Sequence, residues 1–140
     1  MTDSPDLEQD ALLPSGQWEG FYNYPGNTQK HKMDIVLNFS NLSISGSGID
    51  DVGTFLWDGK YDLTEYKGKL VKQYQTHKVH YNGSIDENGI WGIWELFMDF
   101  YTLSGGFHIW PKKQYQDIES ISTKEEVSII ITEYLSISND

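Results

Sequence analysis

Histidines are the residues of this sequence with the widest chemical repertoire, because the imidazole titrates near neutral pH and binds metals. The chain contains four, and His77 and His80 are the only two that lie close together. On a strand, a spacing of three residues places two side chains on opposite faces, so this pair predicts no metal site. We expect one of the two to be packed inside and the other to lie on the surface. We assign no role to His31 or His108.

Two adjacent carboxylates, Asp50 and Asp51, lie in the glycine-rich stretch 46–53. The stretch lacks the alternating Asp or Asn positions and the distal Glu of a calcium loop, whereas Gly and Asp are ordinary turn residues. We therefore interpret it as a turn between strands. The sequence also contains no phosphate-binding glycine loop and no Ser-His-Asp spacing. We expect no metal and no cofactor.

The best acid and base pair for catalysis is His77 with Tyr81, which would share one face of a strand. Four residues of extended chain separate them by about 13 Å, at ~3.3 Å per residue. A third group would be needed to connect them, so an enzyme ranks below a binding protein.

Aromatic residues make up 14% of the chain, and nineteen of the twenty lie between Trp18 and Tyr115. The alternation of strand residues places many of them on common faces. If these faces point into a barrel, they form an aromatic wall with a few polar groups, which is typical of a small-molecule pocket. The alternative is that the same rings simply fill the core. The predicted ligand-binding residues are Tyr22, Trp57, Tyr61, His77, Tyr81 and Trp94.

Strand signals recur along the body of the chain, separated by short turns. The predicted strands cover residues 17–24, 32–39, 42–48, 53–63, 67–74, 78–85, 90–97 and 103–110. No helical periodicity interrupts them, and an open sheet of this kind would leave exposed edges that closure removes. We predict an all-β fold, a closed antiparallel up-and-down barrel of about eight strands. A two-sheet sandwich is the alternative.

The ends of the chain differ from the body. Residues 1–15 are predicted to be a flexible acidic leader, residues 16–115 the barrel domain, and residues 116–140 an acidic C-terminal segment with six acids and one Lys. Within that segment, five apolar residues have helical spacing and predict a short amphipathic helix over 123–135. A strand through Val127, Ile129 and Ile131 is the alternative. The five are Val127, Ile130, Ile131, Tyr134 and Leu135.

The net charge is −11, and all ten basic residues are Lys. Without Arg, which pairs with phosphate and guanine through two hydrogen bonds, binding to nucleic acid or an anionic membrane is not expected. The chain has no cysteine and no apolar run of the ~20 residues that a membrane span needs. It begins without the basic and apolar regions of a signal peptide. These features predict a cytoplasmic location.

Three stretches of the body resemble calycin-type barrels, and the avidin branch in particular. They are Gly16-Gln17-Trp18, the run from Leu56 to Asp62, and the run from Tyr74 to Gly83 followed by Trp94. The resemblance implies a barrel that binds a ligand in its interior. It does not imply biotin, because the Asn that avidins carry two residues after the first Trp is Gly20 here. Tyr24 occupies the position of the avidin Gly-Ser. His77 and Val79 correspond roughly to the Ser and Thr that line the next part of the avidin site. Lipocalins carry a Tyr-containing motif in a later strand and an Arg near the last strand, and this sequence has neither.

We therefore expect a non-enzymatic barrel that binds a small apolar or planar molecule in an aromatic-lined interior. The alternative is a protein–protein interaction module that uses the barrel surface and residues 123–135. The sequence leaves the oligomeric state open.

Overall fold

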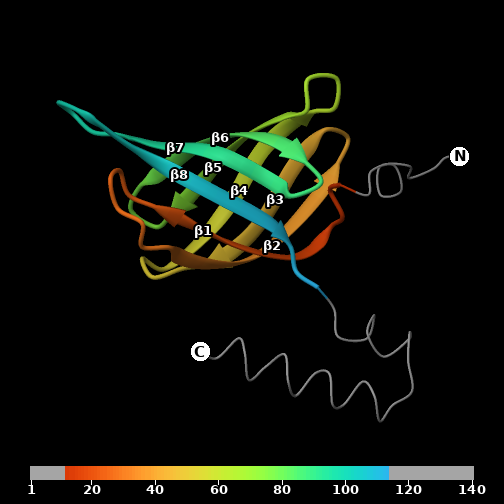
Figure 1. The fold of residues 1–140 in the computed structure, drawn as a ribbon, viewed down its shortest axis with the longest axis horizontal. Helices are drawn as coiled ribbons and strands as arrows, with labels where there is room; N and C mark the ends of the chain where they lie inside the picture. The colour runs from red at the N-terminus through yellow and green to blue at the C-terminus, as the bar shows by residue number, and fades with distance from the viewer. Residues whose placement is uncertain (1–11, 114–140) are drawn as a thin grey trace, which may run out of the picture.

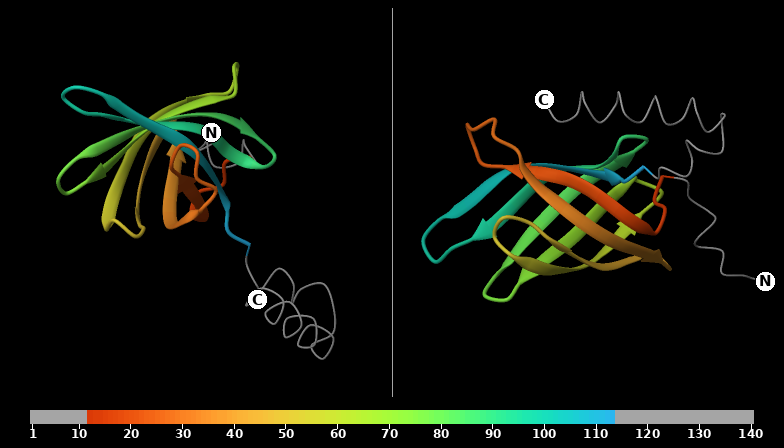
Figure 2. Two further views of the ribbon diagram at one scale, coloured as in Figure 1. Left: turned by 60° about the vertical axis from the view of Figure 1, so that its left-hand side comes forward. Right: turned by 90° about the horizontal axis from the view of Figure 1, so that it is seen from below.

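The computed structural model describes residues 12–113 and contains eight strands in an all-β fold (Figure 1). Each strand pairs antiparallel with the next in the chain, and β8 pairs with β1, which closes the barrel. The strands are β1 (Gly16–Asn23), β2 (His31–Ser40), β3 (Ser43–Ile49), β4 (Thr54–Asp62), β5 (Lys67–Tyr74), β6 (Lys78–Asp86), β7 (Gly89–Phe97) and β8 (Thr102–Pro111). The predicted closed up-and-down barrel is confirmed, and the sandwich alternative is wrong. Two further views show the strands wrapped around one common axis (Figure 2).

Alternation of apolar and polar residues explains why these segments are strands. In β2, Met33, Ile35, Leu37 and Phe39 are buried, and the residues between them are exposed. A strand presents successive side chains to opposite faces, so one face of β2 forms the barrel interior and the other faces solvent. Every strand end lies within one residue of its predicted position.

Close packing between strands also requires small residues at certain positions. A Cβ atom on Gly20 of β1 would lie 2.1 Å from the carbonyl oxygen of His108 on β8. Only glycine allows this approach of the two backbones.

The interior divides into two ends. At one, which we call the Leu13 end, residues 12–15 pack against the barrel and Leu13 belongs to the core. The Trp18 indole donates a hydrogen bond to the Pro14 carbonyl at 2.8 Å, and the Phe39 amide donates one to Ser15 Oγ at 2.9 Å. The packed part of the chain therefore extends to the N-terminal side of Gly16.

The opposite end, the Asp50 end, is bordered by the four connections 24–30, 50–53, 75–77 and 98–101. The β7–β8 hairpin extends beyond the rest of the barrel, at the left of Figure 1. The predicted segment 116–140, with its helix over 123–135, lies outside the described residues, as do residues 1–11 of the predicted leader. Between residues 12 and 113, no helix is long and apolar enough to cross a membrane.

Candidate functional site

The Asp50 end contains a cavity of about 100 Å³ between side chains of the barrel interior. Four of the six predicted ligand-binding residues, Tyr22, His77, Tyr81 and Trp94, line this cavity. The full lining is Tyr22, Tyr24, Val52, Lys72, Tyr74, His77, Val79, Tyr81, Trp94, Leu96 and Leu103. The structure thus brings together residues from five strands and from the connections between them.

The other two predicted residues lie elsewhere. Trp57 is buried next to the cavity wall, with its ring centroid 5.0 Å from that of Tyr81 in an edge-to-face contact. Its indole Nε1 is buried and has no hydrogen-bond partner among the described residues. Tyr61 packs on Phe39, with ring centroids 5.6 Å apart, in the part of the core that lies toward the Leu13 end. Tyr61 does not line the cavity.

The most unusual group at the cavity is Lys72, whose side chain is only 1% exposed. It follows Gly68 and Leu70 on the inward face of β5. Its ammonium donates hydrogen bonds to Asp50 Oδ2 at 2.5 Å, to the Tyr81 hydroxyl at 3.1 Å and to Met33 Sδ at 3.3 Å. A buried charge is tolerated when it is paired and hydrogen-bonded in this way.

Aromatic rings surround the same ammonium. Five ring centroids lie between 4.5 and 5.9 Å from Nζ, which places them within the range of a cation–π interaction. They belong to Tyr22, Phe55, Trp57, Tyr74 and Tyr81. The aromatic faces that were predicted to form a wall therefore also hold a positive charge.

Asp50 connects the β3–β4 turn to this cluster. Its Oδ1 accepts hydrogen bonds from the amides of Val52 and Gly53, at 2.9 and 3.3 Å. Its Oδ2 accepts one from Lys72 and one from the Tyr74 hydroxyl, both at 2.5 Å. The predicted turn is present, but it also delivers a fully buried carboxylate to the barrel interior. The sequence interpretation missed this second role.

Burial changes the titration of these groups. It lowers the pKa of Lys72 to about 8, although the hydrogen bond to Asp50 opposes the change. Burial raises the pKa of Tyr74 well above its usual range, and the hydrogen bond to Asp50 adds to the shift. The pKa of Tyr81 is also raised, mainly by burial and then by the negative charge of Asp50. Each shift favours the neutral form of the group.

These shifts predict that the free energy of unfolding is greatest near pH 10. Between pH 8 and 10 the unfolded chain holds a proton on Lys72 that the folded chain has lost, so the free energy of unfolding should rise, by at most ~1.4 kcal/mol per pH unit. Above pH 10 the sign reverses, because the unfolded chain loses tyrosine protons that the folded chain keeps. Urea unfolding at a series of pH values measures both trends. The rise should be absent from Lys72→Met, and an equal rise in that variant would contradict the assignment.

A second polar group lies at the rim of the cavity. The Tyr22 hydroxyl donates a hydrogen bond to Asp51 Oδ1, and His31 Nδ1 contacts Asp51 Oδ2, both at 2.5 Å. The Tyr22 and His31 rings stack, with centroids 4.8 Å apart. Partial burial of Asp51 acts to raise its pKa, but the hydrogen bonds from Tyr22 and His31 outweigh this and the pKa is lowered. His31, which received no role from the sequence, therefore helps to hold the β3–β4 turn.

His77 lies in the β5–β6 connection and His80 lies on β6, and both are half-buried, so the expected division into one packed and one surface histidine is not observed. His77 lines the cavity and stacks on Tyr74, with ring centroids 4.8 Å apart, whereas His80 contacts Phe97 at 5.1 Å. In the described part of the chain, no three His, Asp or Glu side chains form a group that could hold a metal ion.

The cavity combines apolar walls with a few hydrogen-bonding groups. Aromatic side chains form much of the wall. A hydrogen-bonded polar cluster lies at one side, where Lys72 and Tyr74 donate to Asp50 and the Tyr81 hydroxyl accepts from Lys72. An apolar cavity of about 150 Å³ is large enough for benzene, so this cavity suits a molecule smaller than benzene. Strand alternation alone could have identified Lys72, because it occupies an inward position in β5.

Comparisons with models of protein families, with curated proteins and with solved structures each found no match. The class that the fold defines is the closed eight-stranded antiparallel β-barrel, an architecture compatible with a calycin-like fold.

Proposed function

We propose that this protein is a non-enzymatic binding protein that holds a small molecule in the cavity at the Asp50 end of its barrel. The observation that carries the proposal is the cavity of about 100 Å³ lined by aromatic rings and by the buried Lys72. Ligand sites in proteins combine apolar walls with a few polar groups that orient the ligand. The expected ligand is planar or apolar over most of its surface and carries one hydrogen-bonding group.

The energetics of the Lys72–Asp50 pair support this proposal. Replacing a buried ion pair with apolar residues of similar volume is often neutral or stabilising, so the core does not require this pair for stability alone. A role in orienting a polar ligand group explains its place beside a cavity. The sequence resemblance to avidin-type and lipocalin-type barrels supports the same function, since those proteins bind ligands inside the barrel.

Binding can be tested with small neutral compounds and two tryptophan variants. A ligand at one hundred times its Kd should stabilise the fold by about 2.7 kcal/mol and raise the melting temperature by several degrees. It should also change tryptophan fluorescence, because Trp94 lines the cavity and donates a hydrogen bond to the Asn23 carbonyl at 3.0 Å. The fluorescence change should disappear in Trp94→Phe.

The matched control is Trp91→Phe, since Trp91 lies on the outer face of the barrel and is 44% exposed. This variant should keep the full response. If a panel of small apolar and planar compounds neither raises the melting temperature nor alters the fluorescence of the wild type, the proposed function is wrong.

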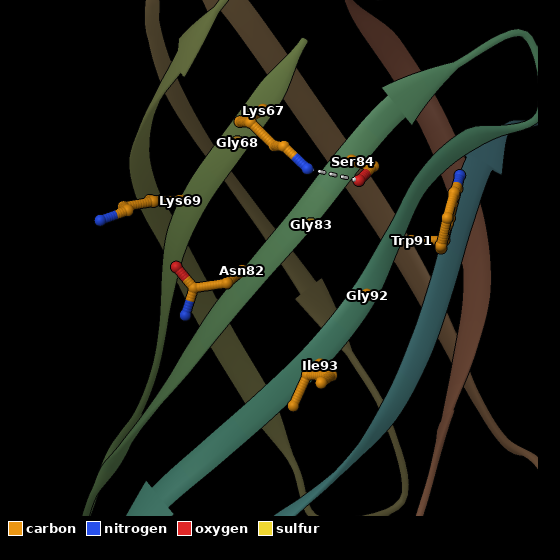
Figure 3. Close-up of a pocket in the computed structure, with 9 residues that line it drawn as sticks. All are labelled: Lys67, Gly68, Lys69, Asn82, Gly83, Ser84, Trp91, Gly92 and Ile93. Atoms are coloured by element: carbon orange, nitrogen blue, oxygen red, sulfur yellow. Dashed lines mark hydrogen bonds between the residues drawn. The ribbon is translucent and has the colours of Figure 1, made fainter. Parts of the chain in front are cut away.

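A second candidate is supported by a hollow of about 520 Å³ on the outer face of β5, β6 and β7 (Figure 3). The backbone of three glycines that face the interior, Gly68, Gly83 and Gly92, lies side by side across these strands and forms the floor of the hollow. Around them, Figure 3 shows Lys67, Lys69, Asn82, Ser84, Trp91 and Ile93. An exposed apolar group among lysines suits an acidic protein partner, which is the interaction module that the sequence offered as an alternative.

The two candidates use different faces of the barrel and can be separated. Trp91→Ser with Ile93→Ser changes the outer hollow and leaves the cavity lining intact. Loss of a protein partner in this double variant, with unchanged small-molecule binding, would favour the interaction module as an additional function. If the double variant keeps every protein partner, the outer hollow is not the interaction site.

A further inference from the structure

Lys72 differs from every other lysine that the structure describes. Residues 12–113 contain nine lysines, of which eight are exposed and Lys72 alone is buried. Lys72 lines the cavity that we assign to a ligand, and a primary amine beside a bound small molecule is a nucleophile toward carbonyl carbon. We propose that Lys72 binds a small aldehyde or ketone covalently and reversibly, as an imine at Nζ. This inference rests on the proposed function and names the chemical class of the ligand.

The hydrogen bonds around Nζ supply the proton transfers that imine formation needs. Asp50 Oδ2, 2.5 Å from Nζ, can accept a proton from the ammonium and so free the nitrogen lone pair for attack on the carbonyl carbon. The C–N bond forms, the C=O π bond breaks, and one proton passes from the attacking nitrogen to the carbonyl oxygen, which becomes a hydroxyl. Asp50 then returns the proton to this hydroxyl, which leaves as water while the C=N bond forms. The Tyr81 hydroxyl, 3.1 Å from Nζ, is placed to donate a hydrogen bond to the same oxygen.

The charge of the site is unchanged by the reaction. One ammonium ion and one carbonyl compound give one protonated imine and one water molecule. A protonated Lys72 and the protonated imine therefore both give Asp50 a positively charged partner. This matters because Asp50 is fully buried, and an unpaired buried charge is strongly destabilising. The five aromatic rings around Nζ stabilise a cationic imine as they stabilise the ammonium.

Burial also increases the fraction of reactive amine. With a pKa of about 8, roughly half of Lys72 is neutral at pH 8, compared with about 0.3% of a lysine with the ordinary pKa of 10.5. The cavity volume of about 100 Å³ limits the carbonyl compound to one smaller than benzene. A three-carbon aldehyde satisfies this limit.

The test uses the wild-type protein with propanal and sodium cyanoborohydride at pH 8, because the hydride traps the imine as a stable secondary amine. Peptide mapping by mass spectrometry then measures the propylation of each lysine. Lys72 should react at least ten times faster than Lys69 and Lys67, which are exposed residues on the same strand and serve as internal controls. The preference should disappear in 8 M urea. Equal or slower reaction of Lys72 in the folded protein would overturn the inference.

Propan-1-ol separates this inference from the proposed function, since it has a similar size but no carbonyl group. If saturable binding of propan-1-ol changes the Trp94 fluorescence while propanal leaves Lys72 unmodified, the covalent inference is wrong and the binding function stands. If propan-1-ol does not bind and Lys72 is not modified, both are overturned for ligands of this size. Selective modification of Lys72 supports both.

Discussion

Replacing Lys72 with Met should lower the free energy of unfolding by about 3–5 kcal/mol at pH 7, which is the usual cost of removing one partner from a buried ion pair. The reason is the carboxylate that remains. Asp50 is fully buried, and without Lys72 its Oδ2 keeps only the hydrogen bond from Tyr74. Methionine has a similar length to the aliphatic part of lysine, so loss of packing contributes little. Urea unfolding followed by tryptophan fluorescence measures the change.

Two further variants give this prediction its controls. Lys69→Met changes an exposed lysine on the same strand and should alter stability by no more than about 0.5 kcal/mol. The double variant Lys72→Met with Asp50→Asn should recover much of the loss, because the amide oxygen of Asn still accepts the amide hydrogen bonds of the turn and carries no charge. If Lys72→Met alone is as stable as the wild type, the buried pair is not the interaction that the structure indicates.

Replacing Gly105 with Ala should cost about 2–3 kcal/mol of stability, at the upper part of the range for overpacking. An added Cβ would lie 2.1 Å from the Asn23 carbonyl oxygen and 2.7 Å from Cζ2 and Nε1 of Trp94. Gly105 is directly opposite Trp94 in the β7–β8 register, and the Trp94 indole is hydrogen-bonded to the same Asn23 oxygen. Alanine must therefore displace both the strand and the cavity wall. Small-molecule binding at the cavity should weaken along with the stability.

Gly68→Ala is the matched control for this substitution. Gly68 is also a strand glycine on the inward face, but the nearest atoms to an added Cβ are side-chain carbons at 3.7 and 3.8 Å. Alanine fits there, so stability should be unchanged or rise by at most about 1 kcal/mol through the lower entropy of the unfolded chain. Equal melting temperatures for the two alanine variants would show that Gly105 does not determine the position of Trp94.

Local pattern was sufficient for the fold. The alternation seen in β2, the short turns and the absence of helical periodicity predicted eight strands, each within one residue of its observed ends. The underlying reason is that strand alternation is a local property, which each segment expresses when one of its faces is buried. Closure also followed from general physics, because pairing β1 with β8 removes both sheet edges.

Alternation predicts which face a side chain occupies, but not its level along the barrel. Tyr61 and Trp57 share an inward face of β4, yet Tyr61 lies toward the Leu13 end while Trp57 packs beside Lys72. Four residues of extended strand separate these two side chains by about 13 Å along β4, so residues chosen by face alone extend over both ends of the barrel. For this reason the predicted set of six residues was brought together only in part.

The sequence by itself determined the barrel, the strand limits and an aromatic interior that includes four residues of the cavity wall. Only the tertiary structure decided that Lys72 and Asp50 form a buried pair, because 22 residues separate them and they meet only when β5 and the β3–β4 turn share one end of the closed barrel. In isolation, Asp50 has the composition of a turn, and Lys72 is a charged residue at an inward strand position whose partner the alternation does not identify. Their chemistry arises from burial, since removal from water is what couples the two charges and lowers the pKa of the amine.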